Sequence, residues 1–213
     1  MSKYKVSDKT QLALIEAAGS LAAENGFSAV TTRAIAERAG ENIGSIHYHF
    51  GGRDKLFEAV FHHVAQDWID NPLDDRTADC DLTTKEGQAE SLRRTINRFA
   101  DLMFDKQKPD WHCRTIFQVL RFPSPLRDLF REIIMDHEHE QVGRVLLKVD
   151  PSLTNETLEL HFNLLFASLI IHSDNRDVIL SRLGQSTYSH EYMQDLVNEC
   201  IDQALLRYRL PLE

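Results

Sequence analysis

Apolar side chains along this chain recur every three or four positions, which is the spacing of one face of an α-helix. Glycine, asparagine, proline and hydroxyl residues divide this pattern into segments. The predicted helices lie between residues 7 and 26, 32 and 40, 45 and 50, 53 and 71, from Leu92 to Met103, and over 115–122, 126–149, 156–172 and 188–208. No segment alternates between apolar and polar residues with turns on both sides, so the pattern predicts an all-α protein.

Two of these helices, 156–172 and 188–208, have broad apolar faces. The stretch LELHFNLLFASLIIH is apolar on nearly all sides, which indicates burial by neighbouring helices or by a partner chain. Two such helices from each chain can close a four-helix interface with two-fold symmetry. The residues predicted to form this dimer interface are Leu158, Phe162, Leu165, Leu169, Met193, Val197, Ile201 and Ala204. The alternative is that both faces fill an ordinary core within one chain.

The composition fits one or two globular domains in a reducing compartment. The 213 residues are 42% hydrophobic and 27% charged, which permits a sizeable core. The sequence has no apolar run long enough to span a membrane and no segment near Met1 that resembles a signal peptide. Three widely spaced cysteines without a CxxC motif predict reduced thiols. We therefore expect a cytoplasmic protein with no membrane partner.

Charge is divided unevenly along the chain. The net charge of −9 by itself argues against a nucleic-acid partner. Residues 1–56, however, hold seven Lys/Arg and six Asp/Glu, a net of +1, which leaves −10 for the remainder. The acidic stretch 74–87 predicts a solvated connector. The N-terminal segment is therefore the part of the chain that can approach phosphates without strong repulsion.

The two short helices near the N-terminus have the residues that a helix-turn-helix requires. Ala36 is small where two helices cross closely, Gly40 suits a left-handed turn, and Ile46 can anchor the second helix in the core. Thr32 lies where a hydroxyl and helix N-terminal amides can hold a phosphate. The residues expected to project from the second helix are Ser45, His47, Tyr48 and His49.

The stretch TTRAIAERAGENIGSIHYHFGGRDKLFEAV resembles the DNA-binding region of TetR-family transcriptional regulators in the order and spacing of its residues. The resemblance covers residues 7–64, about a quarter of the chain. Many members of the family have a valine directly after the glycine, where this chain has Glu41, so Ile43 is expected to supply that apolar contact two places later. His47 also stands where tyrosine is commoner in the family.

The resemblance implies a role for each matching residue. Arg33 would reach the major groove, and Arg53 would anchor the DNA backbone from the start of the fourth helix. The other matches are the phosphate contacts Thr32 and Tyr48 and the base-proximal Ser45 and His47. With His49 and Lys55, these residues make up the expected DNA-binding set. The alternative for Arg33 is a merely solvated surface residue.

Together these observations predict a two-domain homodimer. A TetR-type helix-turn-helix domain is expected at 1–62, and a larger helical domain for effector binding and dimerisation at 63–213. The expected partners are double-stranded operator DNA, a small-molecule effector and a second copy of the chain. The expected function is a DNA-binding transcriptional regulator, a repressor released from a palindromic operator by the effector. The alternative is a helical ligand-binding or enzymatic protein whose N-terminal module no longer binds DNA.

Histidine pairs raise the question of a metal or catalytic site. His47 and His49 are two positions apart and point in different directions on a helix, and the pairs at 62–63 and 137–139 also diverge. The chain contains no GxSxG, GxGxxG, P-loop or HExxH motif. We therefore expect no enzymatic activity, no cofactor and no metal site.

Aromatic and methionine side chains after the fourth helix are candidates for an effector pocket. The expected lining is Trp68, Phe99, Met103, Trp111, Phe117, Arg121 and His137. Such residues at helical spacing more often form plain core, which is the alternative. The negative balance of this region favours a neutral or cationic apolar compound over an anion.

Overall fold

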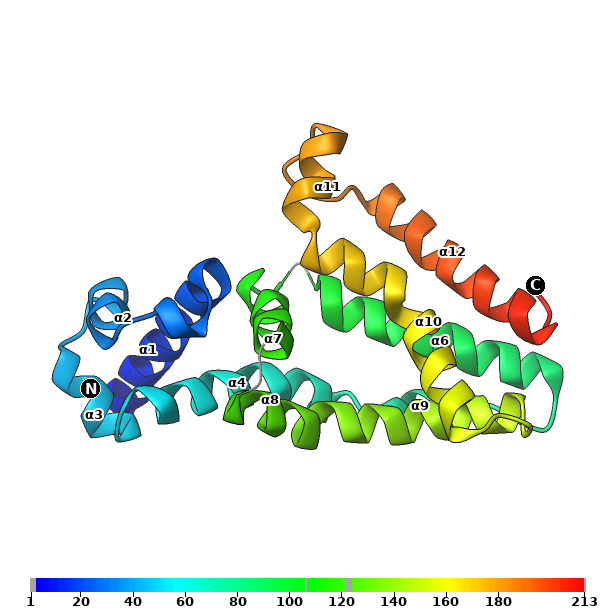
Figure 1. Cartoon of the computed structure of the whole chain (residues 1–213), viewed down its shortest axis with the longest axis horizontal. Helices are drawn as coiled ribbons and strands as arrows, with labels where there is room; N and C mark the ends of the chain where they lie inside the picture. Colours follow the sequence, from blue (N-terminus) through cyan, green and yellow to red (C-terminus); the bar gives the residue numbers. More distant parts are fainter. Residues whose placement is uncertain (1–2, 106, 122–123, 213) are drawn as a thin grey trace. The chain divides into compact units, whose positions relative to one another are not determined.

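The computed structural model describes residues 3–105, 107–121 and 124–212, without the side chains of 3–7, 117 and 121. The helices (Figure 1) are α1 (Lys3–Asn25), η1 (Phe27–Ala29), α2 (Thr32–Ala39), α3 (Ile43–Phe50), α4 (Arg53–Asp70), α5 (Leu73–Thr77), α6 (Lys85–Phe104), α7 (Trp111–Arg121), α8 (Pro125–Phe130), η2 (Arg131–Met135), α9 (Asp136–Val149), α10 (Asn155–Asp174), α11 (Arg176–Leu183) and α12 (His190–Tyr208). Here η1 is a 3₁₀ turn and η2 is π-helical. The described residues contain no β-strand, and the predicted all-α class is confirmed.

Differences from the predicted helices are local. The single helix expected over 126–149 is interrupted by the π-helical turn η2. Two short helices, α5 and α11, were not predicted, and α5 overlaps the start of the acidic stretch expected to be a connector. Its one apolar anchor, Leu73, is fully buried, which a short polar segment does not reveal. The predicted end of the helix 115–122, Phe122, lies outside the described residues.

The chain divides into two compact units. Unit 1 contains Met1–Ile69 and Gln107–Ile134, and unit 2 contains Asp70–Lys106 and Met135–Glu213. The predicted domain boundary at 62/63 does not coincide with this division, because α7 packs against α1 within unit 1. Trp111 lies directly over Gly19, where a Cβ atom would come within 2.2 Å of the indole ring. The functional division into 1–62 and 63–213 stays a prediction.

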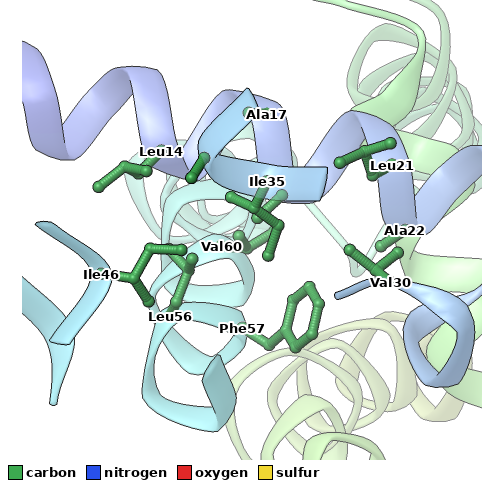
Figure 2. Close-up of a cluster of buried hydrophobic side chains, with 12 residues drawn as sticks. Leu14, Ala17, Leu21, Ala22, Val30, Ile35, Ile46, Leu56, Phe57 and Val60 are labelled. Carbon is green, nitrogen blue, oxygen red and sulfur yellow. The ribbon is translucent and has the colours of Figure 1, made fainter. Parts of the chain in front are cut away.

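Four helices of unit 1 converge on an apolar core. Figure 2 shows Leu14 of α1, Ile35 of α2, Ile46 of α3 and Leu56 of α4 in one cluster, and all four side chains are fully buried. Burial of such a side chain contributes roughly 1.5–3 kcal/mol relative to leaving it exposed. This cluster holds the two short helices, which are too short to be stable alone.

Unit 2 is built around α6, which contacts α5, α9, α10 and α12. Its interior contains a buried ion pair, in which the Arg98 guanidinium donates to both carboxylate oxygens of Glu138 at 2.8 and 2.7 Å. Arg98 Nε also donates to the carbonyl of Asn71. Nearby, Gln141 Oε1 accepts the backbone N–H of Leu73 at 2.7 Å. The residues that follow α4 are therefore held by polar side chains of α6 and α9.

The faces predicted for dimerisation are largely interior in the single chain. The residues Leu165, Leu169, Ile201 and Ala204 are buried, while Leu158, Phe162, Met193 and Val197 are partly buried. The expectation that the first four face a partner is therefore corrected. The cause is that α10 is apolar on nearly all sides, so periodicity could not decide which side turns toward α6 and α12. The outward side of α10 instead carries Leu160, Leu164 and Ile171.

Candidate nucleic-acid interface

The α3 helix presents a polar, aromatic face above a single buried anchor. Ile46 is fully buried in the unit 1 core, whereas His47 is exposed and Tyr48 exposes 83% of its surface. Asn42 caps the helix, because its side-chain oxygen accepts the backbone N–H of Gly44 at 2.8 Å. The helix therefore begins at Ile43, two residues earlier than predicted. Ser45 is half-buried on the first turn.

The turn between α2 and α3 has the predicted left-handed glycine. Gly40 adopts φ 67° and ψ 27°, and its N–H bonds to the carbonyls of Ala36 and Glu37. This conformation favours glycine because a Cβ atom is strained there. Ala36 is buried, as the helix crossing requires. The expectation for Ile43 is wrong, since 48% of its surface is exposed and it supplies no core contact of the kind expected.

The start of α2 is capped by Thr31, whose hydroxyl accepts the backbone N–H of Ala34 at 3.2 Å. The cap leaves Thr32 as the first residue of the helix, half-buried. Arg33 follows on the exposed surface and donates to Glu37 at 2.9 Å. An exposed pair of this kind contributes little stability, so Arg33 can exchange Glu37 for another acceptor at small cost.

The Arg53 side chain forms hydrogen bonds within unit 1. Its Nε donates to the carbonyl of Val30 at 2.8 Å, and its Nη2 donates to the carbonyl of Phe27. The guanidinium also lies over the Phe57 ring, 5.0 Å from the ring centre. These contacts join the start of α4 to the segment before α2, a role that no sequence signal indicated. The predicted contact of Arg53 with the DNA backbone stays a prediction.

The other two expected DNA contacts also have partners within the chain. Lys55 is exposed and pairs with Glu58 at 2.6 Å. His49 is half-buried, and its Nδ1 lies 3.5 Å from Gln11 Nε2 of α1. Beside it, the Thr10 hydroxyl donates to Glu41 at 3.0 Å. His49 is thus turned toward α1, and His47 and Tyr48 are the more accessible side chains of α3.

A bidentate ion pair joins α2 to α1. The Arg38 guanidinium donates to both carboxylate oxygens of Glu24 at 2.9 and 3.1 Å and to the Ser20 hydroxyl at 3.1 Å. The hydrogen bond from Arg38 lowers the pKa of Glu24. This pair was not predicted, because the two residues are 14 positions apart and belong to different helices. It bridges α1 and α2 at the exposed surface.

The residues predicted for an effector site fall on both units. In unit 1, Trp68 is buried and Trp111 covers Gly19. In unit 2, Phe99 and Met103 are buried, and the Phe99 ring stacks on Phe166 with centres 4.1 Å apart. His137 is exposed there and lies 2.7 Å from the Gln141 amide. The side chains of Phe117 and Arg121 lie outside the described residues. An effector role for this set stays a prediction.

Beside Trp111, unit 1 has a titratable cluster that the sequence did not indicate. The His63 and His112 rings are 5.4 Å apart, and Asp67 Oδ2 lies 3.7 Å from His112 Nδ1. Asp67 also pairs with Lys108 at 2.6 Å. Burial, and then the nearby His63, lower the pKa of His112. Four residues from α4, the α6–α7 connection and the first turn of α7 thus share one small, partly buried site.

Comparison with known proteins places these features in context. Residues 14–60 match the family described as bacterial regulatory proteins, tetR family. The HTH-type transcriptional dual regulator CecR of Shigella flexneri is 25% identical over 194 residues, which cover 88% of this chain and 86% of that protein. Across the described residues, no helix is both long and apolar enough to cross a bilayer.

Solved structures of regulators share the fold along nearly the whole chain. The hemolysin II transcriptional regulator HlyIIR has a TM-score of 0.64 at 16% identity, with 92% of this chain and 97% of that chain covered. A transcriptional regulator from Rhodococcus sp. Rha1 has a TM-score of 0.59 at 20% identity, with 92% and 96% covered. The similarity therefore extends beyond the helix-turn-helix to the C-terminal helices.

Proposed function

Because this chain belongs to the TetR family and is a DNA-binding transcriptional regulator, we propose that it represses transcription as a homodimer bound to a palindromic operator. A small-molecule effector would release it from that operator. The observation that carries the proposal is the pairing in α3 of the fully buried Ile46 with the exposed His47 and Tyr48. A rigidly anchored short helix with an accessible polar face can enter a major groove.

The proposed contacts fall into two groups, those to DNA bases and those to phosphates. His47 and Ser45 lie on the face of α3 that would approach base edges, and Arg33 would reach a base from α2. Thr32 and Tyr48 would hold phosphates, as would Arg53, Lys55 and His49. Arg53 and His49 are expected to contribute less to phosphate binding than the others. Arg53 already donates to the carbonyls of Phe27 and Val30, and the His49 ring already contacts Gln11.

Dimerisation is supported by an apolar stripe on α10. Leu160, Leu164 and Ile171 are spaced at four and seven residues and expose 54%, 46% and 54% of their surfaces. On α12, Leu206 is also exposed. A contiguous apolar stripe of this kind indicates a protein contact. The partly buried Leu158, Phe162, Met193 and Val197 would line the edges of such an interface.

The proposed dimer predicts the form of the operator. Two α3 helices related by two-fold symmetry would meet half-sites about one helical turn apart, ~34–36 Å, or a multiple of that spacing. We propose that repression occurs in the cytoplasm, where the DNA lies. A catalytic function is not favoured by any observation on this chain.

A mobility-shift assay with DNA from upstream of the chain's own gene tests the DNA contacts. His47→Ala and Tyr48→Ala should each weaken binding, with His47→Ala changing the preferred sequence and a loss of ~1–3 kcal/mol for a base contact. His190→Ala changes an exposed histidine at the start of α12 and is the matched control. Unchanged binding in both α3 variants would remove the proposed interface.

Light scattering without DNA tests the dimer. Leu164→Glu should convert the protein to a monomer, because it places a charge in the apolar stripe. Val178→Glu changes an equally exposed apolar residue of α11 and should leave the dimer intact. A wild-type monomer at micromolar concentration would contradict the proposal, as would a dimer that both variants preserve.

A further inference from the structure

A polar hollow lies between α5 and α6 in unit 2. Its volume is about 320 Å³ and its lining residues are Arg76, Arg94, Asn97, Arg98 and Asp101. Small-molecule sites typically measure roughly 300–1,000 Å³, so this α5–α6 hollow can hold a compact ligand. None of its residues was among those predicted to bind the effector. Its walls carry both basic and acidic groups, and their existing partners decide which of them are available.

Two of the three arginines are already neutralised by neighbouring carboxylates. Arg94 Nε donates to Glu90 at 2.7 Å, and its Nη1 pairs with Asp79 and also donates to the carbonyl of Arg76. These two carboxylates hold the pKa of Arg94 above its ordinary value. Arg98 is bound to both oxygens of Glu138 in the interior. Neither guanidinium brings an uncompensated charge to the hollow.

The remaining charges in the hollow are one cation and one anion. Within the described part of the chain, the side chains of Arg76 and Asp101 form no hydrogen bond or ion pair, and both are exposed. Asn97 donates its amide to the carbonyl of Arg93 at 2.9 Å, which leaves its side-chain oxygen as an acceptor. Asn97 and Asp101 are four residues apart and share one face of α6. Donors thus come from α5 and acceptors from α6.

We propose that the α5–α6 hollow binds a small zwitterion, a molecule that carries one carboxylate and one ammonium group. The planar guanidinium of Arg76 matches a carboxylate in two parallel hydrogen bonds. The Asp101 carboxylate and the Asn97 oxygen accept from the ammonium group. A simple anion would meet repulsion from Asp101, and a simple cation would meet repulsion from Arg76, so only a ligand with both charges satisfies both walls.

The hollow is also connected to the residues that follow α4. Arg98 lines it and donates to the carbonyl of Asn71. A ligand that shifts α5 or α6 would therefore act on the segment after the helix that begins in the DNA-binding unit. This regulatory consequence rests on the proposed function, whereas binding of the zwitterion does not.

Calorimetry on the full-length protein without DNA tests the site with three matched probes. The probes are 6-aminohexanoate, hexanoate and hexylamine, which share a six-carbon chain and differ in their charged groups. We expect 6-aminohexanoate to bind more tightly than each single-charge probe by about two- to fivefold, the range for one exposed charge contact. Equal affinity for 6-aminohexanoate and either single-charge probe would overturn the proposal, as would an absence of binding.

Two variants assign the two ends of the ligand. Arg76→Gln should weaken the binding of 6-aminohexanoate and hexanoate but not that of hexylamine, which loses a repulsive charge. Asp101→Asn should weaken the binding of 6-aminohexanoate and hexylamine but not that of hexanoate, for the same reason. Neither substitution removes a hydrogen bond or ion pair present in the structure. Arg182→Gln on α11 makes the same charge change at an exposed position outside the hollow and is the control. If Arg182→Gln weakened the binding of 6-aminohexanoate as much as Arg76→Gln does, the effect would be a general electrostatic one and the proposed site would be overturned.

Operator affinity is measured separately, with and without 6-aminohexanoate. The wild-type protein must first bind both the operator and 6-aminohexanoate. A change in operator affinity on adding 6-aminohexanoate supports regulation through the hollow if Arg76→Gln abolishes that change. If bound 6-aminohexanoate does not change the operator affinity, the proposed regulation is wrong, but the proposed binding site is not contradicted. Loss of operator binding in every condition would instead contradict the proposed function.

Discussion

The interiors of the two units differ in what holds them together. Unit 1 is centred on a cluster of aliphatic side chains from four helices. Of the seven polar or charged side chains that are buried in the described residues, six lie in unit 2, among them Arg98, Glu138 and Gln141. An apolar core is stabilised by shape and burial, while a buried polar network requires every partner to be present. Loss of a single partner should therefore cost more stability in the polar interior of unit 2 than a similar change at the surface of either unit.

The largest effect should come from breaking the ion pair of unit 2. Glu138→Ala leaves the Arg98 guanidinium buried without its partner and should lower the free energy of unfolding by ~3–5 kcal/mol. Replacing both residues, Arg98→Met with Glu138→Leu, removes the charges together and should be far less costly. Denaturant unfolding followed by circular dichroism measures both. Equal losses in the single and double variants would show that the pair does not act as a unit.

In unit 1, removing the anchor of α3 tests the aliphatic core. Ile46→Ala should cost ~2–5 kcal/mol, because the side chain is fully buried and leaves a cavity. Ile43→Ala alters a half-exposed isoleucine on the same helix and should change stability by no more than ~0.5 kcal/mol. Both values come from the same unfolding experiment. If Ile46→Ala lowered the free energy of unfolding no more than Ile43→Ala, the result would be incompatible with the described core.

The packing of α7 on α1 gives a third test. Gly19→Ala places a methyl group within 2.2 Å of the Trp111 ring and should cost ~1–3 kcal/mol, since the ring must move. Gly143→Ala in α9 is the control from unit 2, where the added methyl would meet Leu158 at 3.4 Å, an ordinary contact. That substitution should be neutral or stabilising by ~0.5–1 kcal/mol. A neutral Gly19→Ala would mean that Trp111 does not lie on α1.

The smallest effect concerns the titratable cluster of unit 1. Burial lowers the pKa of His112 in the folded protein, so the unfolded chain takes up the proton more readily. Stability should therefore fall as the pH drops through the ordinary histidine pKa of about 6.5, and it should be regained above that pH. His112→Gln should flatten this part of the profile, measured by unfolding between about pH 8 and pH 5.5, whereas His190→Gln should not. A profile that His112→Gln leaves unchanged would contradict this assignment.

Much of the local structure could be predicted because its causes are local. Gly40 and Ile46 are a left-handed turn residue and an apolar anchor at a fixed short spacing, and each performs its predicted role. The candidate DNA-reading face follows from the same short-range spacing. The prediction for Ile43 was wrong because two extra positions of spacing did not carry the side chain into the core.

The sequence alone determined the all-α class and the helix-turn-helix, because hydrophobic periodicity and turn chemistry act within a few residues. The function as a DNA-binding regulator was indicated by the resemblance of residues 7–64 to the TetR family. Only the tertiary structure decided which side of α10 is buried, since a helix that is apolar all round has no preferred inward face in its sequence. It also decided that Arg53 binds the carbonyls of Val30 and Phe27, and that Arg98 pairs with Glu138 across 40 positions. Contacts between distant segments depend on how whole helices pack, and periodicity within one helix does not specify its partners.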